Sequence, residues 1–342
     1  MSEQTEKKIS IIIPCYNVDK YIDRCINSLV AQTLGIDALQ LILVDDASQD
    51  RTPKKLAWWA ARYPQSIEVI LLPENRRQGG ARNEGWRHAV APYIGFVDSD
   101  DWVAPEMYEL LYQAMEQEEC DFVTCCGRRT ATPQVQLNQN VFASRKIEIK
   151  DEEARKSFLL ERLSGGIWSK LFRREFLEKA APEFPEQTAY EDNYWMAMLR
   201  LQTDSCYLLG RELYYYYANP ESTILQTNSK RHLERLAIEE QKLAEYKRRG
   251  VFETYYREFE YEFLRLYYIN SLHTFFLRFS DMSLLPFSEM QRKVKEYFPD
   301  YRNNPYLERF LPLERELLKT IELELSNGQW EMLAEQYRKE MS

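Results

Sequence analysis

A chain of 342 residues, of which 44% are hydrophobic and 29% charged, is long and apolar enough to bury a sizeable core, which excludes a disordered protein. We expect one large domain with a smaller appendage. The formal net charge of −9 argues against nucleic acid as the main partner, because binding to a phosphate backbone requires concentrated Lys and Arg. The six cysteines lie in apolar runs without a C-x-x-C pair, so we predict reduced core residues rather than a disulfide framework or a zinc site.

The first residues lack the apolar run of a signal peptide, and no stretch reaches the roughly 18 apolar residues that a membrane span requires. We therefore expect a cytoplasmic protein.

The first part of the chain alternates short apolar runs with amphipathic segments. Runs rich in Ile and Val predict buried strands over 9–13, 39–44, 67–72 and 93–97. Between the first two, apolar residues at four-residue spacing predict a helix that lies on the sheet. Strand and helix units that recur about every thirty residues predict right-handed crossovers and a mostly parallel sheet. Such sheets bind ligands at the carboxyl ends of their strands.

The pattern changes after about residue 125. The polar stretch 128–149 predicts a loop or a hairpin, and 151–164 predicts a helix. From residue 231 the pattern is almost wholly helical, with an aromatic-rich run over 255–279. We therefore predict an α/β fold with helices flanking the sheet, divided into a first domain over 1–228 and a helical region over 229–342.

Three carboxylates follow the fourth predicted strand within four residues, at Asp98, Asp100 and Asp101. Their mutual repulsion is costly unless a cation or hydrogen-bond donors neutralise it. Oxygen ligands of this kind suit Mg²⁺ or Mn²⁺, which bind one or two carboxylates together with phosphates. The alternative is a polar turn in which Asp98 or Ser99 caps the next helix.

Two other acidic pairs stand at comparable positions. Asp45 and Asp46 follow the second predicted strand, where a carboxylate can accept hydrogen bonds from a base or a ribose, or can cap a helix. Glu191 and Asp192 open an amphipathic run, where a carboxylate can act as general base or can stabilise the first turn of a helix. Spacing alone does not decide between these alternatives.

Several common site types are missing from the sequence. The three histidines are too scattered for a triad or a metal trio, and neither G-x-x-x-x-G-K-[ST] nor G-x-G-x-x-G occurs. ATP and NAD are therefore not expected as ligands.

The motifs together resemble the inverting family 2 glycosyltransferases with a GT-A fold. Residues 10–17, Ser-Ile-Ile-Ile-Pro-Cys-Tyr-Asn, are similar to the first strand and base-binding loop of that family, and 44–48, Val-Asp-Asp-Ala-Ser, to its next landmark. Residues 96–102, Phe-Val-Asp-Ser-Asp-Asp-Trp, resemble its DxD metal motif. Downstream, 167–176 resembles the W-x-K-L-Y-R-R-E-F block of polysaccharide-building members, and 190–192 resembles the E-D pair that supplies the base.

The resemblance implies roles for particular residues. It implies that Asp192, beside Glu191, takes a proton from the acceptor hydroxyl, and that Asp100 and Asp98 bind Mn²⁺ or Mg²⁺. The residues expected to bind the donor are Pro14, Tyr16, Asn17, Asp46, Arg77, Arg82, Asp98, Ser99, Asp100, Trp168 and Lys170. Lys170 and Arg82 either add positive charge near the phosphates or form salt bridges at the edge of the core. Trp168 either stacks on a sugar ring or packs in the core. Arg77 departs from the family pattern, which has Gly there, so Arg76 and Arg77 either contact the donor pyrophosphate or form a solvated loop.

The activity that the resemblance implies is metal-dependent transfer of a hexose from a nucleotide diphosphate donor, with uridine as the expected base. The acceptor would be a hydroxyl of a glycan or lipid-linked molecule in the synthesis of a cell-surface polysaccharide. Two alternatives are a catalytically silent binding or scaffolding protein of the same fold and a sugar nucleotidyltransferase. The aromatic C-terminal helices either pack on the first domain or on a second copy of the chain, or contact the inner face of the membrane as an amphipathic surface.

Overall fold

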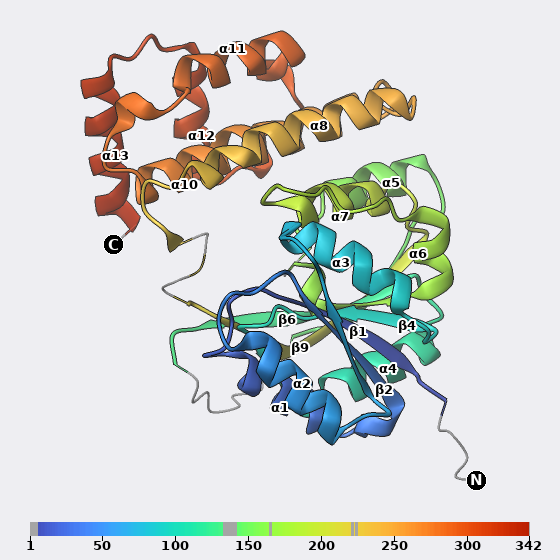
Figure 1. The fold of residues 1–342 in the computed structure, drawn as a ribbon. Helices are drawn as coiled ribbons and strands as arrows, with labels where there is room; N and C mark the ends of the chain where they lie inside the picture. Colours follow the sequence, from blue (N-terminus) through green and yellow to red (C-terminus); the bar gives the residue numbers. More distant parts are fainter. Residues whose placement is uncertain (1–5, 133–141, 164–165, 220–221, 223–224, 342) are drawn as a thin grey trace. The chain divides into compact units, whose positions relative to one another are not determined.

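The computed structural model describes residues 6–132, 142–163, 166–219, 222 and 225–341 (Figure 1). The chain divides into two compact units, Met1–Asn219 and Pro220–Ser342. The functional division predicted from the sequence, after residue 228, falls further along the chain and stays a prediction. Within the described ranges, the helices are all too short or too polar to cross a bilayer.

The first unit contains a mixed sheet, which has nine strands in the part of the chain that is described. Their order is β3-β2-β1-β4-β8-β6-β9-β5, with β7 beside β9. The strands are β1 Ile9–Cys15, β2 Leu39–Asp45, β3 Ile67–Leu71, β4 Tyr93–Phe96, β5 Trp102–Val103, β6 Phe122–Thr130, β7 Arg145–Glu148, β8 Lys170–Arg173 and β9 Ser205–Tyr217.

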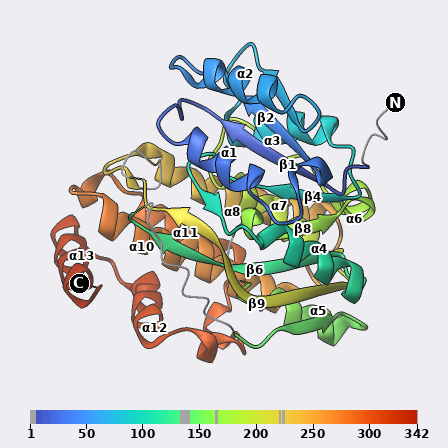
Figure 2. The same cartoon turned by 90° about the horizontal axis from the view of Figure 1, so that it is seen from below.

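The first half of the sheet is parallel. β1 pairs in parallel with β2 and β4, and β2 pairs in parallel with β3, so the four strands predicted from the apolar runs are confirmed. β8 then runs antiparallel to both β4 and β6, and β9 is parallel to β6 (Figure 2). β5 is only two residues long, and β8 is a four-residue strand with a charged residue at each end, so neither forms an apolar run like the one that predicted β4.

Helices cover both faces of this sheet. α1, α2 and α4 lie on one face, and α3, α6 and α7 lie on the other (Figure 1). Side chains of β1 alternate between the two cores: Ile11 and Ile13 pack with α1, α2 and α4, whereas Ile12 packs with α3. The helices of this unit are α1 Ile22–Val30, α2 Thr52–Arg62, α3 Arg77–His88, α4 Met107–Glu118, α5 Glu152–Leu159, α6 Arg174–Ala180 and α7 Glu191–Arg200.

A glycine sets the distance between α3 and the sheet. A Cβ at Gly85 would lie 2.5 Å from Cγ2 of Ile12 and 3.2 Å from Cγ2 of Val44, both within the core. Only glycine therefore allows α3 to approach β1 and β2 this closely. The approach matters because α3 also carries an arginine of the site described below.

Two predicted segments differ from the structure. The helix predicted over 151–164 ends at Leu159. The hairpin alternative for 128–149 is wrong for its described flanks, because β6 and β7 pair with β9 and not with each other; residues 133–141 lie outside the described part.

The second unit is built of helices throughout its described residues. They are α8 Glu234–Arg248, α9 Tyr256–Phe263, a π-helical segment Leu264–Ile269, α10 Asn270–Arg278, α11 Phe287–Tyr297, α12 Pro312–Lys319 and α13 Asn327–Met341, with short 3₁₀ turns between them. This confirms the prediction that the C-terminal part of the chain is helical.

Stacked aromatic rings form the core of the second unit. Tyr246 stacks on Phe259 with ring centroids 3.8 Å apart, and Phe263 stacks on Tyr267 at 4.2 Å. The aromatic residues of 255–279 that suggested a membrane surface are largely buried here, and their rings contact residues of the same unit. The aromatic residues of 255–279 therefore pack in the core of their own unit and do not form an exposed amphipathic face.

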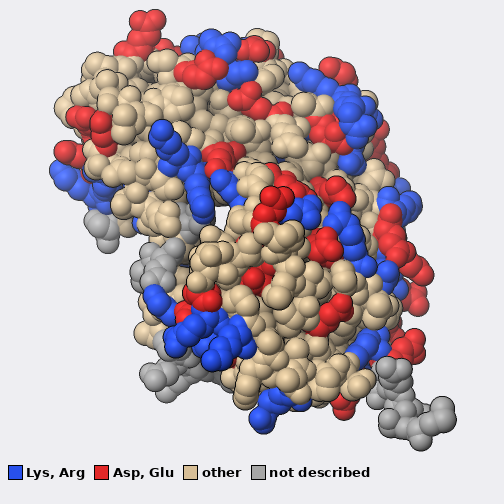
Figure 3. Space-filling view, viewed as in Figure 1, with Lys and Arg blue, Asp and Glu red and all other residues tan. Residues whose placement is uncertain are grey.

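Basic and acidic side chains are interspersed over the face of the molecule displayed in Figure 3. Many of them form local ion pairs, such as Arg292 with Glu289 and Glu296 on α11. Exposed pairs of this kind contribute little to stability, at most about 1 kcal/mol each, and keep the surface polar.

Candidate active site

The polar loops after β1, β2 and β4 meet at one edge of the sheet, as predicted from the sequence. The backbone N–H of Asp46 donates to the carbonyl of Cys15 at 2.8 Å, and the N–H of Asn17 donates to Oγ of Ser48 at 3.0 Å. The loop that follows β1 is thus tied to the loop that follows β2. Pro14 is buried in β1, whereas Tyr16 is 46% exposed at the rim.

Asp46 organises the start of α3. Its Oδ1 accepts a hydrogen bond from the backbone N–H of Arg76 at 2.7 Å, and burial raises the pKa of Asp46. Neither Asp45 nor Asp46 caps the helix that follows β2, because α2 begins only at Thr52, whose N–H donates to Asp50. Asp46 instead accepts from the residue that immediately precedes α3, so the helix-cap alternative holds for Asp46 at α3.

The two arginines at this turn differ. Arg76 forms an ion pair with Glu186, so its charge is neutralised by the protein. Arg77, with φ of 59°, begins α3 in the left-handed region, where the family pattern has glycine. Its role in donor binding stays a prediction.

The three aspartates after β4 have different partners. Oδ1 of Asp98 accepts from Nη2 of Arg82 at 2.8 Å, and Oδ2 of Asp100 accepts from Nδ2 of Asn219 at 3.0 Å. Asp101 is fully buried and accepts from the hydroxyl of Tyr214 and the backbone N–H of Tyr217, both at 2.7 Å. Asp101 therefore anchors β9, whereas Asp98 and Asp100 are the carboxylates left for a ligand.

The helix-cap alternative for Asp98 and Ser99 is also wrong. Strand β5 intervenes directly after the cluster, and α4 begins only at Met107. Burial and the neighbouring carboxylates raise the pKa values of Asp100 and Asp101. The three carboxylates thus lie close together without capping α4.

Arg82 joins this cluster to the acidic pair on α7. Its Nη2 binds Asp98 and its Nη1 binds Glu191, and the arginine side chain is only 3% exposed. Asp98 and Glu191 are distant in sequence, and spacing alone gave no reason to place them together. The structure therefore brings two of the predicted acidic groups into one buried ion network.

Glu191 and Asp192 occupy the first turn of α7 but differ in exposure. Glu191 is 2% exposed and faces Arg82, whereas Asp192 is half-buried. Burial raises the pKa of Glu191 to about 7. The positive charge of Arg82 opposes this rise but does not cancel it, because Arg82 also interacts with Asp98 and Asp192. Of the pair, Asp192 is the more exposed carboxylate.

Lys170 and Trp168 lie beside these groups. Nζ of Lys170 donates to the carbonyl of Gly166 at 2.8 Å, and burial lowers the pKa of Lys170 to about 8. The ring of Trp168 stacks on Tyr214 with centroids 4.2 Å apart. Trp168 thus packs against the tyrosine that fixes the aspartate segment.

Sequence reasoning missed Arg24 and the contacts that Tyr214 and Asn219 make with Asp101 and Asp100. The guanidinium of Arg24 lies 4.0 Å from the centre of the Trp102 ring, and its Nη2 donates to the backbone carbonyl of Asp100 at 2.6 Å. Arg24 belongs to a helix whose only sequence signal was its apolar face, so no pattern marked it.

We expect Tyr214→Phe to destabilise the protein by about 1–3 kcal/mol, because it leaves a buried oxygen of Asp101 and the N–H of Asp98 without a partner. Urea unfolding of the full chain measures the change. Tyr216→Phe on the same strand is the matched control, since the hydroxyl of Tyr216 has no hydrogen-bond partner among the described residues. Equal stability of the two variants would refute an anchoring role for Tyr214.

Asp98 and Asp100 together fit a divalent cation whose other coordination positions are filled by a bound ligand. Asp98 and Asp100 each receive one side-chain hydrogen bond, which leaves lone pairs on both carboxylates. Across the described ranges, no group of three or more His, Cys, Asp or Glu side chains is arranged to hold a metal by itself. Two carboxylates completed by phosphate oxygens are a common arrangement for Mg²⁺ and Mn²⁺.

Comparison with known proteins identifies the family. The family model described as Glycosyl transferase family 2 matches residues 10–180. EpsJ of Bacillus subtilis (strain 168), named an uncharacterized glycosyltransferase, is 34% identical over 225 residues, which cover 63% of this chain and 62% of EpsJ. GgaB of the same organism, named a minor teichoic acid biosynthesis protein, is 33% identical over 150 residues, covering 42% of this chain and 16% of GgaB.

A solved structure shows the same fold. TarS 1–349 from S. aureus, in complex with UDP-GlcNAc, has a TM-score of 0.58 and 18% identity, covering 97% of this chain and 92% of the TarS chain. The fold is thus the α/β fold of GT-A glycosyltransferases. Because the family match covers half of its length, the chain belongs to glycosyl transferase family 2. It matches less than two thirds of the length of EpsJ.

Proposed function

We propose that this protein is an inverting glycosyltransferase that moves a hexose from a UDP-sugar to a hydroxyl of a glycan or lipid-linked acceptor in the synthesis of a cell-surface polysaccharide. The observation that carries the proposal is the bridge from Asp98 through Arg82 to Glu191, which holds the aspartate segment and the acidic pair of α7 together. Family membership and the teichoic acid name of GgaB support the substrate class.

In the proposed reaction, Asp192 accepts the proton of the acceptor hydroxyl, and the oxygen of that hydroxyl attacks the anomeric carbon of the sugar. The bond from that carbon to the diphosphate breaks, and UDP leaves with the electron pair. Asp98 and Asp100 would hold Mn²⁺ or Mg²⁺, which when bound supplies positive charge for the diphosphate. A single displacement requires no covalent intermediate on the protein.

The remaining predicted residues have supporting roles in this proposal. The loop of Tyr16 and Asn17 together with Asp46 would receive the uridine, because these residues share one sheet edge with the aspartate segment. Lys170 and Arg82 would balance the surrounding carboxylates. The catalytic region over 1–228 and the cytoplasmic location are parts of the same proposal.

A thermal-shift panel of UDP, GDP, CDP and dTDP, each with and without Mn²⁺, tests the donor site. A ligand at about 100 times its Kd stabilises the folded state by about 2.7 kcal/mol, so we expect UDP with Mn²⁺ to raise Tm by several degrees. Asp100→Asn should lose this shift, and Asp37→Asn, an exposed aspartate before β2, should keep it. The absence of any shift in the folded wild type would favour a binding or scaffolding role.

A further inference from the structure

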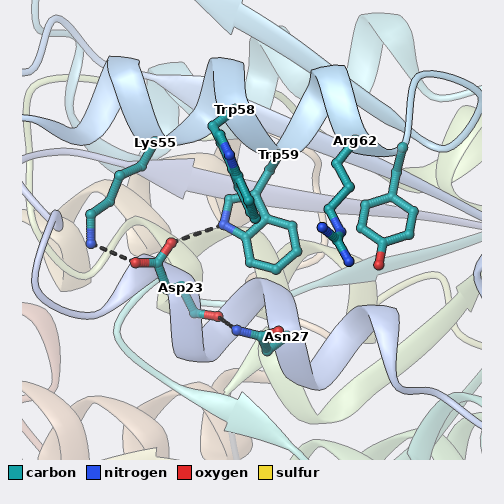
Figure 4. Close-up of a pocket in the computed structure, with 7 residues that line it drawn as sticks. Asp23, Asn27, Lys55, Trp58, Trp59 and Arg62 are labelled. Atoms are coloured by element: carbon teal, nitrogen blue, oxygen red, sulfur yellow. Dashed lines mark hydrogen bonds and ion pairs between the residues drawn. The ribbon is translucent and has the colours of Figure 1, made fainter.

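A cleft lies between α1 and α2, on the sheet face that these helices cover. It has a volume of about 550 Å³, within the roughly 300–1,000 Å³ of small-molecule sites. Figure 4 shows side chains of α2 reaching down toward α1, whose Asp23 and Asn27 form the opposite side. The lining residues are Asp23, Asn27, Lys55, Trp58, Trp59, Arg62 and Tyr63.

One end of the cleft is fixed by hydrogen bonds between the helices. Asp23 accepts from Nζ of Lys55 at 2.5 Å and from Nε1 of Trp59 at 2.9 Å (Figure 4). These bonds lower the pKa of Asp23 although its partial burial opposes them. Trp59 is only 4% exposed and belongs to the core beneath, so this wall is rigid.

The rest of the cleft presents an aromatic surface. Trp58 is 56% exposed, and it is the only exposed one of the seven tryptophans, all of which lie in described parts of the chain. Its ring meets that of Trp59 edge-on, with centroids 4.9 Å apart. An indole held open to solvent in this way offers its face to a ligand.

Three polar groups around this surface form no hydrogen bond or ion pair with the described residues. The guanidinium of Arg62 lies near the rings of Trp58 and Tyr63, at 5.6 and 5.8 Å from their centroids, and it pairs with no carboxylate among the described residues. The hydroxyl of Tyr63 and Oδ1 of Asn27 likewise have no hydrogen-bond partner there. The cleft therefore combines an exposed indole with solvent-exposed donors and acceptors that are able to bind a ligand.

We propose that this cleft is a saccharide-binding subsite that holds a sugar unit of the acceptor glycan away from the transfer site. A pyranose has an apolar C–H face that packs on an indole and a rim of hydroxyls that pair with guanidinium, amide and phenol groups. This chemistry matches Trp58, Arg62, Asn27 and Tyr63. The assignment of the sugar to the acceptor rests on the proposed glycosyltransferase function.

Helix α1 connects the cleft with the candidate active site. Asp23 faces the cleft, and the next residue, Arg24, donates to the backbone carbonyl of Asp100. Successive residues of an α-helix point about 100° apart, so α1 contributes neighbouring side chains to the cleft and to the candidate site. A glycan of several sugar units is long enough to contact both, which would hold a growing chain near the transfer site.

The full chain labelled with 5-fluorotryptophan provides a direct test. An array of bacterial surface polysaccharides identifies glycans that bind, and ¹⁹F NMR then follows the Trp58 resonance, assigned with Trp58→Phe. We expect at least one polysaccharide to bind and to shift this resonance, and Trp58→Ala and Arg62→Ala each to weaken its binding about tenfold. Val90→Ala, which shortens an exposed apolar side chain before β4, is the matched control.

Three results would overturn the inference: no polysaccharide on the array binds, binding is unchanged in Trp58→Ala and Arg62→Ala, or UDP instead of a glycan shifts the Trp58 resonance. The thermal shift with UDP and Mn²⁺, measured on the same samples, tests the proposed function separately from the saccharide subsite. Trp58→Ala should keep the UDP shift. If a glycan binds at the cleft but the chain does not bind UDP, the cleft is still a saccharide site, but the saccharide is not the acceptor of a UDP-sugar transferase.

Discussion

Asp192→Asn is expected to lower the turnover of the proposed transferase by about 10²–10⁴-fold, the usual contribution of a general base. The variant keeps the size of the side chain but cannot accept the acceptor proton. UDP release from the UDP-sugar that gives the largest thermal shift measures the effect. Because Asp192 is not one of the carboxylates proposed for the metal, the shift with UDP and Mn²⁺ should be unchanged.

The alternative for Asp192 is a purely structural role in the first turn of α7. A carboxylate at that position stabilises a helix by about 0.3–1 kcal/mol, which would lower Tm slightly and leave turnover intact. Glu153→Gln is the matched control, since Glu153 stands in the first turn of α5 with its side chain 82% exposed. If the turnover of Asp192→Asn were within about tenfold of that of the wild type, Asp192 would not be the general base.

The parallel half of the fold could be predicted from the sequence because its strands are buried on both faces. The apolar runs of β1 and β2 reflect this burial directly, and each is followed by a polar loop at the carboxyl edge. β5 and β8 left no such signal, because they are short and their places are set by pairing with distant strands. Long-range pairing of this kind is invisible to local periodicity.

The candidate site shows the same limit. The sequence marked Asp98 and Glu191 as unusual acidic positions, but it could not show that Arg82 lies between them. The resemblance assigned Asp98 and Asp100, and not Asp101, to the metal, but the sequence could not show why Asp101 differs, since that depends on β9, whose Tyr214 reaches back to Asp101. Residue types thus indicated the chemistry, and tertiary contacts decided which carboxylate is available for it.

Arg82→Met is expected to have the largest effect on stability. It removes the partner of two carboxylates, one of them fully buried, and breaking a buried ion pair in this way costs about 3–5 kcal/mol. Urea unfolding of the full chain measures the loss. Arg87→Met on the same helix is the matched control, because Arg87 is 47% exposed and its pairs should contribute less than about 1 kcal/mol.

The loss in Arg82→Met should depend on pH, because the raised pKa of Glu191 changes how many protons the folded state binds. Between its ordinary value of 4.5 and about 7, folded Glu191 holds a proton that the unfolded chain has released, so stability falls as pH rises through this window. Without Arg82 the pKa of Glu191 rises further. The variant should therefore lose more stability at pH 8 than at pH 5.

Adding Glu191→Gln to Arg82→Met separates the stabilising role of the arginine from its role in positioning. The double variant has no buried charge at residue 191, so it should recover most of the stability that Arg82→Met loses at pH 8. UDP release should stay low, because Asp98 still lacks the guanidinium that orients it toward the proposed metal. If the double variant were no more stable than Arg82→Met, the cost would lie in packing around α3 and not in the unpaired charge of Glu191.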